Sequence, residues 1–588
     1  MKHNNKITFI LFIILLTLFI SCENIFEPED ENLGTMERIY ENPAFAEGLL
    51  MTAYAKLPTN GFVFNDIATD DAVSNNISNP YLKMATGQWS AYFNPVGLWN
   101  NCISAIFYLN KFISVIDTVT WKWTESELNR LYKIRLKGEA YALRGVFEYY
   151  LLVTIGGVGK NGELLGIPLY GEFIEPDGNF NTPRASFIES VNQIYADYDK
   201  ALEYLTMDDY GDITSLTELP EGLKNVSSVA NYNLVFGKDI IHRISGKTIK
   251  ALKARVALLE ASPAFSTEDV ALWEKTANYA ALVLDKIGGV SGLDPNGHQF
   301  YKANLVDAID ISKGKDQKEA IWRNARGASL SLESRVFPPS LYGKGDVNPT
   351  QNLVDAFPMV NGFPINDPQS LYNPTKPYEN RDPRLSLYIL YNNSVLRGEN
   401  IKTEAGGGIN AKDSIPQSTR TGYYLRKLLR EDVNLNPVGP SAKDHYNMHM
   451  RYTELYLIYA EAANEAWGPD GTGPHAYSSK DVLRAIRKRA GIKQPDLYLN
   501  SISSKEEMRK LIRNERRIEL CFEGFRFWDL RRWKEDLTNP AKGVNINGNN
   551  YTVVQVEDRK YDNSYMIYGP LPDTEVLKYN VLIQNKGW

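Results

Sequence analysis

The chain has 588 residues and a formal net charge of −6, and 43% of its residues are hydrophobic. This composition supplies a large core, and the acidic balance argues against a nucleic-acid-binding protein, which normally carries basic patches. The three cysteines, Cys22, Cys102 and Cys521, are too scattered for a disulfide framework or a CxxC metal site. His445 and His449 are four residues apart and could share a helix face, but they match no zinc motif. We therefore expect no metal and no other cofactor.

The N-terminus predicts an exported lipoprotein. A basic start precedes residues 7–20, which are almost wholly apolar but too few to cross a bilayer as a helix, since that needs about 20 residues. A small residue and a cysteine follow, so we predict a lipoprotein signal peptide over residues 1–21 and lipidation of Cys22. Acidic residues come next, and we expect residues 22–41 to form a polar tether.

The remainder, residues 42–588, is expected to form one body with helices at both ends. Capping boxes such as Ser186 with Glu189, and helical apolar spacing, place most of the helices. The predicted helices cover residues 42–57, 98–116, 125–154, 186–205, 245–260, 267–287, 454–467, 480–490 and 504–523. Alanine-rich faces suggest tetratricopeptide-like helix pairs, although no strict 34-residue period can be read.

These helices divide the body into three parts. A helical N-terminal part covers about residues 42–287, and a helical C-terminal part covers about residues 448–588. Between them, about residues 288–447 are rich in proline and glycine and poor in helical patterns. So long an irregular segment is uncommon unless it carries a function.

Near the C-terminus, Leu511 to Trp533 reads LIRNERRIELCFEGFRFWDLRRW, with charges beside an apolar stripe. Charges in that position should pair, because a lone buried charge costs several kcal/mol. We predict a structural ion-pair clamp that locks this region onto the helices before it. The alternatives are a solvated charged helix and a catalytic set of carboxylates. The charged members of the predicted clamp are Arg513, Glu515, Arg516, Glu519, Glu523, Arg526 and Asp529.

The segment RNERRIELCFEGFRFWDLRRW closely resembles the C-terminal signature of the SusD/RagB family, surface lipoproteins that bind nutrients in Bacteroidetes. RYTELYLIYAEA and NPTQNLVDAFPMVNGFPIND also resemble segments of that family. The resemblance implies a mainly α, SusD-like fold, with tetratricopeptide-like helix pairs and a loop-rich irregular half. It also implies a lipoprotein on the cell surface at the outer membrane, anchored through Cys22. Such a protein would deliver glycan to a SusC-like TonB-dependent transporter.

In that family, ligands bind where non-helical insertions cover the helical scaffold, and two loops here combine aromatic and polar side chains. A sugar favours an aromatic ring under its apolar face and polar groups at its rim. One loop supplies Asp70, Asp71, Asn75, Asn76, Trp89 and Tyr92, and the other Trp322, Arg323, Asn324, Arg326, Phe337 and Tyr342. We select Asp70, Asp71, Asn75, Trp89, Tyr92, Trp322, Arg326 and Tyr342 as candidate ligand-binding residues. The alternative is that Trp89 and Trp322 are buried rings that anchor their loops.

No catalytic motif stands out, and GxSxG and HExxH are absent from the sequence. We therefore expect an oligosaccharide-binding protein and not an enzyme. The alternatives are a peptide-binding, RagB-like receptor, a surface glycosidase, and a purely structural helical scaffold.

Overall fold

The computed structural model describes residues 42–122, 125–175 and 177–588. The predicted signal peptide, Cys22 and the tether lie outside these residues. Within the described ranges, no helix is long and apolar enough to span a membrane.

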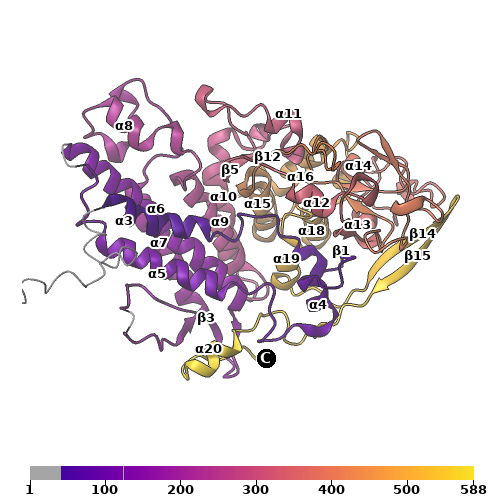
Figure 1. The fold of residues 1–588 in the computed structure, drawn as a ribbon, viewed down its shortest axis with the longest axis horizontal. Helices are drawn as coiled ribbons and strands as arrows, with labels where there is room; N and C mark the ends of the chain where they lie inside the picture. Colours follow the sequence, from indigo (N-terminus) through magenta and orange to yellow (C-terminus); the bar gives the residue numbers. More distant parts are fainter. Residues whose placement is uncertain (1–41, 123–124, 176) are drawn as a thin grey trace, which may run out of the picture.

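One half of the molecule is a stack of long helices in which each packs against the next (Figure 1). Its helices are α3 (Pro43–Ala55), α5 (Trp99–Val115), α6 (Ser126–Ile155), α7 (Phe187–Tyr204), α9 (Gly246–Ala261) and α10 (Val270–Leu284). Ser186 caps α7 in the predicted capping box with Glu189. The contacts run α3–α5, α5–α6, α6–α7, α7–α9 and α9–α10. The tetratricopeptide-like arrangement of helix pairs predicted from sequence is confirmed.

The stack continues past residues 288–447 into the C-terminal helices. These are α15 (Tyr452–Trp467), α16 (Ser479–Ala490) and α18 (Lys505–Glu519). α10 packs against α15, which in turn packs against α16 and α18. Ala277 and Ala281 of α10 and Ala460 and Ala463 of α15 are fully buried. The helices on either side of the irregular segment therefore form one continuous frame.

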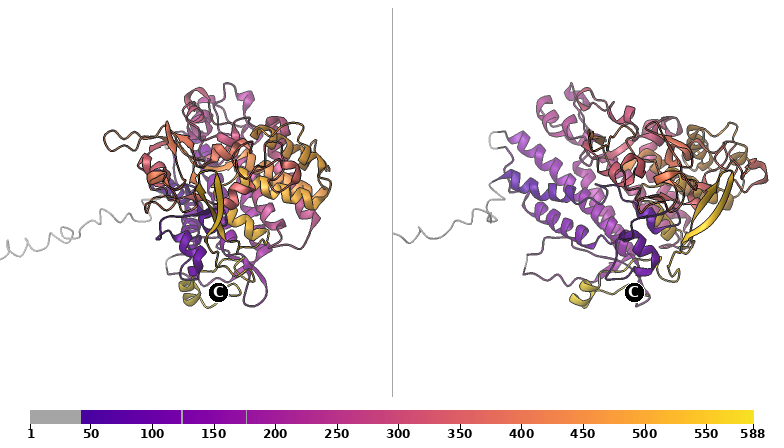
Figure 2. Two further views of the ribbon diagram at one scale, coloured as in Figure 1. Left: turned by 90° about the vertical axis from the view of Figure 1, so that its right-hand side faces the viewer. Right: turned by 45° about the vertical axis from the view of Figure 1, so that its right-hand side comes forward.

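The intervening half is built from short elements around a core of its own (Figure 2). Its helices are α11 (Ala303–Val306), α12 (Ser331–Val336), α13 (Gln351–Ala356) and α14 (Pro383–Tyr388). Short antiparallel pairs join β1 (Ala72–Val73) to β7 (Asn348–Pro349), β5 (Ala320–Arg323) to β13 (Met448–Arg451), β6 (Gly327–Ser329) to β12 (Lys443–His445), β8 (Ile389–Leu390) to β11 (Tyr424–Leu425), and β9 (Ser394–Leu396) to β10 (Glu399–Ile401). Phe64 and Phe522 belong to this core, so both ends of the described chain contribute to it.

The last segment returns to the helical half. α19 (Arg526–Arg532) is followed by the hairpin of β14 (Ala541–Asn547) and β15 (Asn550–Glu557), which runs along one edge of the loop-rich half (Figure 1). α20 (Asp573–Lys578) and the C-terminus then lie beside β3. The remaining elements are α4 (Pro80–Lys83), α8 (Val229–Phe236), α17 (Leu497–Ser501) and the small sheet of β2 (Gly157–Val158), β3 (Leu164–Pro168) and β4 (Arg184–Ser186).

Candidate functional site

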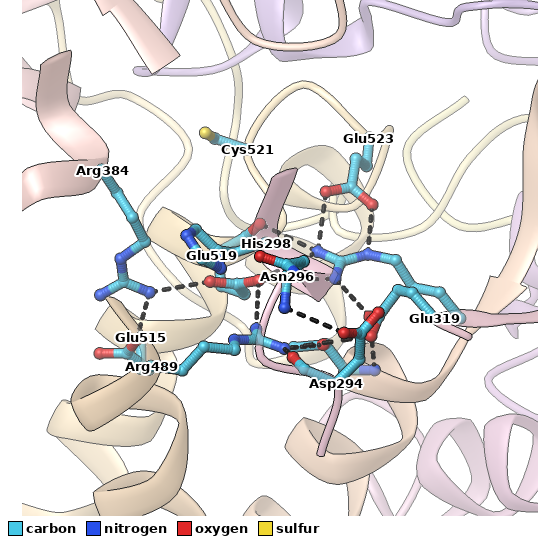
Figure 3. A network of polar contacts seen from close by, with 12 residues as sticks. Asp294, Asn296, His298, Glu319, Arg384, Arg489, Glu515, Glu519, Cys521 and Glu523 are labelled. Atoms are coloured by element: carbon cyan, nitrogen blue, oxygen red, sulfur yellow. Dashed lines mark hydrogen bonds and ion pairs between the residues drawn. The ribbon is translucent and has the colours of Figure 1, made fainter. Parts of the chain in front are cut away.

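Glu519, at the end of α18, is a fully buried carboxylate shared by three arginines (Figure 3). Its oxygens lie 2.7 Å from Nη2 of Arg489, 2.9 Å from Nη1 of Arg384 and 3.5 Å from Nη1 of Arg451. Burial favours the neutral acid, but Arg489, Arg451 and Arg384 outweigh that effect and hold the pKa of Glu519 well below its usual range. The carboxylate is therefore ionised and ties α14, α16 and β13 to α18.

The other clamp residues also pair, several with partners far away in sequence. Glu515 pairs with Arg384 (2.5 Å), Glu523 with Lys427 (2.6 Å) and Arg451 (2.7 Å), Arg516 with Asp529 (2.7 Å), Arg526 with Asp70 (3.0 Å), and Arg513 with Glu535. α18 ends at Glu519, four residues before its predicted end, and this corrects the sequence-based boundary. Phe522 has a left-handed backbone (φ 61°), which a continuing helix does not allow.

Asp70 and Asp71, chosen as ligand-binding residues, are buried parts of the clamp instead. Arg517 Nη2 lies 2.9 Å from Asp70 and also pairs with Asp71, and Arg526 Nη2 lies 3.0 Å from Asp70. Burial raises the pKa of Asp70, but Arg517 and Arg526 overcome it and lower that pKa to about 2. Both carboxylates are committed to arginines, so the expectation that they contact a sugar is corrected.

Trp89 is buried, with 4% of its surface exposed, and is not an open platform. Its indole Nε1 donates a hydrogen bond to Asn94 Oδ1 at 2.9 Å. Its ring lies 4.7 Å from that of Trp588 and 5.8 Å from that of Phe527, both edge-on. Trp89 therefore anchors its loop to the C-terminal segment, which is the alternative left open by the sequence.

Trp322 is likewise 4% exposed, inside β5. Its Nε1 donates to the His242 carbonyl at 3.0 Å, and its ring lies 4.5 Å from that of His449. Phe337 is fully buried, and Arg323 is buried against Asp316. Trp322 and Phe337 therefore belong to the core, and this corrects the expectation that Trp322 forms an open platform.

His445 and His449 do not share a helix face. They lie on β12 and β13, where His445 Nε2 is 3.0 Å from Glu333 and His449 Nδ1 is 2.6 Å from Thr59 Oγ1. Burial lowers the pKa of His449 to about 3, so this ring is neutral at physiological pH. The idea of a shared helix face is wrong because the two histidines lie on extended strands.

Asn75, the next predicted residue, joins three loops. Its Nδ2 donates to the carbonyls of Lys344 and Gly345, both at 3.0 Å, and lies 3.3 Å from that of Ser418. Two of these loops are also linked by a second inter-loop hydrogen bond, in which Asn410 Nδ2 donates to Ser340 Oγ at 2.8 Å. Residues 74–78, 338–345 and 408–418 are thereby held together by hydrogen bonds from these two side chains.

Tyr342 lies on this joined surface and is 58% exposed. It follows the short turn Pro339–Leu341 and has a left-handed backbone (φ 65°), a conformation that non-glycine residues adopt rarely. Strain of this kind is found where surrounding contacts hold a side chain in a required position. We call the exposed side chains of the three loops the Tyr342 surface, and they are Asn76, Ile77, Ser78, Tyr342, Lys344, Ile409, Asp413, Ser414, Pro416 and Gln417.

Tyr92 and Arg326 lie elsewhere. Tyr92 is 78% exposed, and a hydrogen bond from its phenol to Asp573, with the charge of that carboxylate, raises its pKa. Asp573 begins α20, which lies beside the helical half (Figure 1). Arg326 donates to the Val306 carbonyl at 3.2 Å and lies 3.6 Å from Asp444. The predicted residues therefore do not converge on one site.

The sequence did not point to Ile77, Lys344, Ile409 or Gln417. Each is an ordinary loop residue, and only the hydrogen bonds of Asn75 and Asn410 bring their loops together. No sequence motif predicts these hydrogen bonds between loops, because the bonded residues are distant in sequence and most of the acceptors are backbone carbonyls.

Comparison with known proteins places this chain among the SusD-like proteins. The SusD family model matches residues 307–588, and the model described as "Starch-binding associating with outer membrane" matches residues 39–218. The helix stack and the loop-rich half are the fold of that class. The chain belongs to the SusD/RagB family.

Individual relatives extend over nearly the whole chain. SusD-like protein P38 of Formosa agariphila is 24% identical over 567 residues, which are 92% of this chain and 94% of that protein. A SusD-like protein from Bacteroides fragilis has a TM-score of 0.70 at 23% identity, covering 94% of this chain and 99% of its own. A laminarin-binding SusD-like protein has a TM-score of 0.58 at 18% identity, covering 93% of this chain and 100% of its own.

Proposed function

We propose that this protein captures oligosaccharide at the cell surface and delivers it to a SusC-like TonB-dependent transporter. The lipid on Cys22 would hold it at the outer membrane. The mechanism involves no bond chemistry, because ring stacking and rim hydrogen bonds give reversible binding.

The observation that most supports binding is the position of Tyr342. This ring is exposed and lies on loops joined through Asn75 and Asn410, and the same loops carry the exposed residues Asn76 and Lys344. Loops that carry an exposed phenol ring together with amide and ammonium donors are suited to a sugar, whose apolar face needs a flat partner and whose hydroxyls need polar ones. Family membership and the laminarin-binding structural relative support the same ligand class.

Affinity electrophoresis in gels containing laminarin or soluble starch tests this function. We expect the wild-type protein to be retarded by at least one glycan, and Tyr342→Ala to lose about tenfold in affinity, the effect of about 1.4 kcal/mol from one lost stacking contact. Tyr92→Ala is the matched control, because it removes another exposed tyrosine ring in a different part of the molecule. Equal retardation of the wild type and Tyr342→Ala would place any binding site elsewhere.

The same samples separate the other function classes. Shortened glycan products after incubation would indicate a glycosidase. Retardation by no glycan, together with binding of an extended peptide, would indicate a RagB-like peptide receptor.

A further inference from the structure

A second feature, which shares no residue with the Tyr342 surface, is a largely apolar cleft of about 260 Å³ between the helical half and the C-terminal segment. Tyr149 and Tyr150 of α6 lie on one wall, and Phe525 and Trp528 on another. The exposed residues Gly61 and Val63 are among its lining residues and form its rim. Aromatic walls and an opening to solvent are typical of sites for small molecules.

The charges lining this cleft are not balanced. Each of four lining arginines has a carboxylate within 2.7 Å: Arg255 with Glu454, Arg451 with Glu523, Arg516 with Asp529, and Arg532 with Glu461. The fifth, Arg531, forms a salt bridge with no carboxylate among the residues described by the structure. A buried cation without a neighbouring anion is energetically unfavourable, so such a site favours the binding of an anion.

The local contacts of Arg531 satisfy only part of its guanidinium. Nε donates to the Ile567 carbonyl at 2.6 Å, and the group lies over the rings of Trp89, Phe527 and Trp528 at 5.2–5.4 Å. Its Nη1 has no hydrogen-bond partner in the described part of the chain, and the same is true of Arg516 Nη1. Burial lowers the pKa of Arg531 to about 9, which shows how little compensating charge surrounds it. Two buried donors on lining residues thus lack acceptors.

We propose that this cleft binds a small amphiphilic anion, a carboxylate or sulfonate carried on a flat apolar body. The anionic group pairs with the Arg531 guanidinium, and the aromatic lining residues cover the apolar body. The charge-assisted contact neutralises the one unpaired cation among the described lining residues. This site is separate from the proposed glycan surface and does not depend on it.

Two fluorescent probes with the same ring system test the proposal on the mature chain. One is 8-anilino-1-naphthalenesulfonate, and the other is neutral N-phenyl-1-naphthylamine, which lacks the sulfonate. We expect saturable binding of the sulfonate, tighter than that of the neutral probe by about tenfold, the effect of one charge-assisted hydrogen bond. Laminarin should not displace either probe.

Three variants locate the site. Arg531→Met should weaken the sulfonate by about tenfold and leave the neutral probe unchanged, since it removes charge but keeps an apolar side chain. Val153→Trp fills the cleft from α6 and should weaken both probes. Arg513→Gln removes a cation outside the cleft, whose partner is Glu535, and should change neither.

Several results would overturn the proposal. They are non-saturating fluorescence with the wild type, equal affinity of the two probes for it, or undiminished binding of both to Val153→Trp. An equal loss of both probes in a folded Arg531→Met would show that the cation is not the recognition element. If Arg531→Met fails to fold, the proposal is still tested by two results. These are the preference of the wild type for the sulfonate probe over the neutral probe, and the loss of binding in Val153→Trp.

Discussion

Replacing Glu519 by Gln removes one carboxylate from a buried network while nearly preserving its shape. The structure shows how many arginines this leaves unpaired. Arg384 and Arg451 each keep two other carboxylates, whereas Arg489 keeps only Glu319, at 3.9 Å. One buried cation, and not three, therefore loses its main partner. Breaking a buried pair in this way costs about 3–5 kcal/mol, and we expect Glu519→Gln to be destabilised by that amount.

Urea unfolding, followed by tryptophan fluorescence and circular dichroism, measures this loss, and hydrogen exchange of the α18 amides localises it. Glu203→Gln is the control, because its pair with Lys200 is exposed and should contribute less than about 0.5 kcal/mol. Adding Arg489→Met should recover part of the loss, with a coupling of about 1–3 kcal/mol, because it removes the orphaned cation. An unfolding midpoint and slope equal to those of the wild type would refute the reasoning that this network stabilises the frame.

Three further predictions concern other parts of the chain. Burial and the neighbouring Asp71 raise the pKa of Asp66 to about 7. The unfolded chain releases this proton near pH 4 and the folded chain near pH 7, so stability falls across that interval. Asp66→Asn should therefore stabilise the protein by a few kcal/mol at pH 8 but not at pH 4, and equal effects in unfolding at both pH values would contradict this. Trp89→Ala should cost about 3–5 kcal/mol in urea unfolding and leave glycan retardation unchanged, and the reverse pattern would restore this ring as a ligand platform. Cys22→Ala should move the protein from the membrane to the soluble fraction and abolish fatty-acid labelling, whereas retained labelling would exclude this cysteine as the anchor.

The helical frame could be predicted because its signals are local. Ser186 with Glu189 forms the predicted capping box in the structure, and Ser504 with Glu507 forms a second one at the start of α18. Apolar spacing and alanine faces indicated the helix pairs, and these helices do pack side by side. The end of α18 was missed because the left-handed conformation of Phe522 follows from its tertiary contacts and not from its residue type.

The ligand surface could be predicted only in part, because an aromatic ring among polar residues can be an exposed platform for a sugar or a buried ring that anchors its loop. For Trp89 and Trp322 the neighbouring polar groups accept hydrogen bonds from the indole itself, whereas Tyr342 faces solvent. Nothing in the sequence around Asp70 indicates that its carboxylate pairs with Arg517, which lies 447 residues further along the chain. Long-range pairing of this kind is invisible to local spacing, so the role of Tyr342 as a glycan contact stays a prediction.

The pairing of Asp70 and Asp71 with Arg517 and Arg526 has a consequence for biosynthesis. An early loop receives its counter-charges only when almost the entire polypeptide has been made. Until then its two acids must remain hydrated, and the surrounding hydrophobic surface stays accessible to chaperones and proteases. A truncated translation product that ends before Arg517 would thus be open to degradation, and only copies that reach the C-terminal arginines would mature into resistant ones.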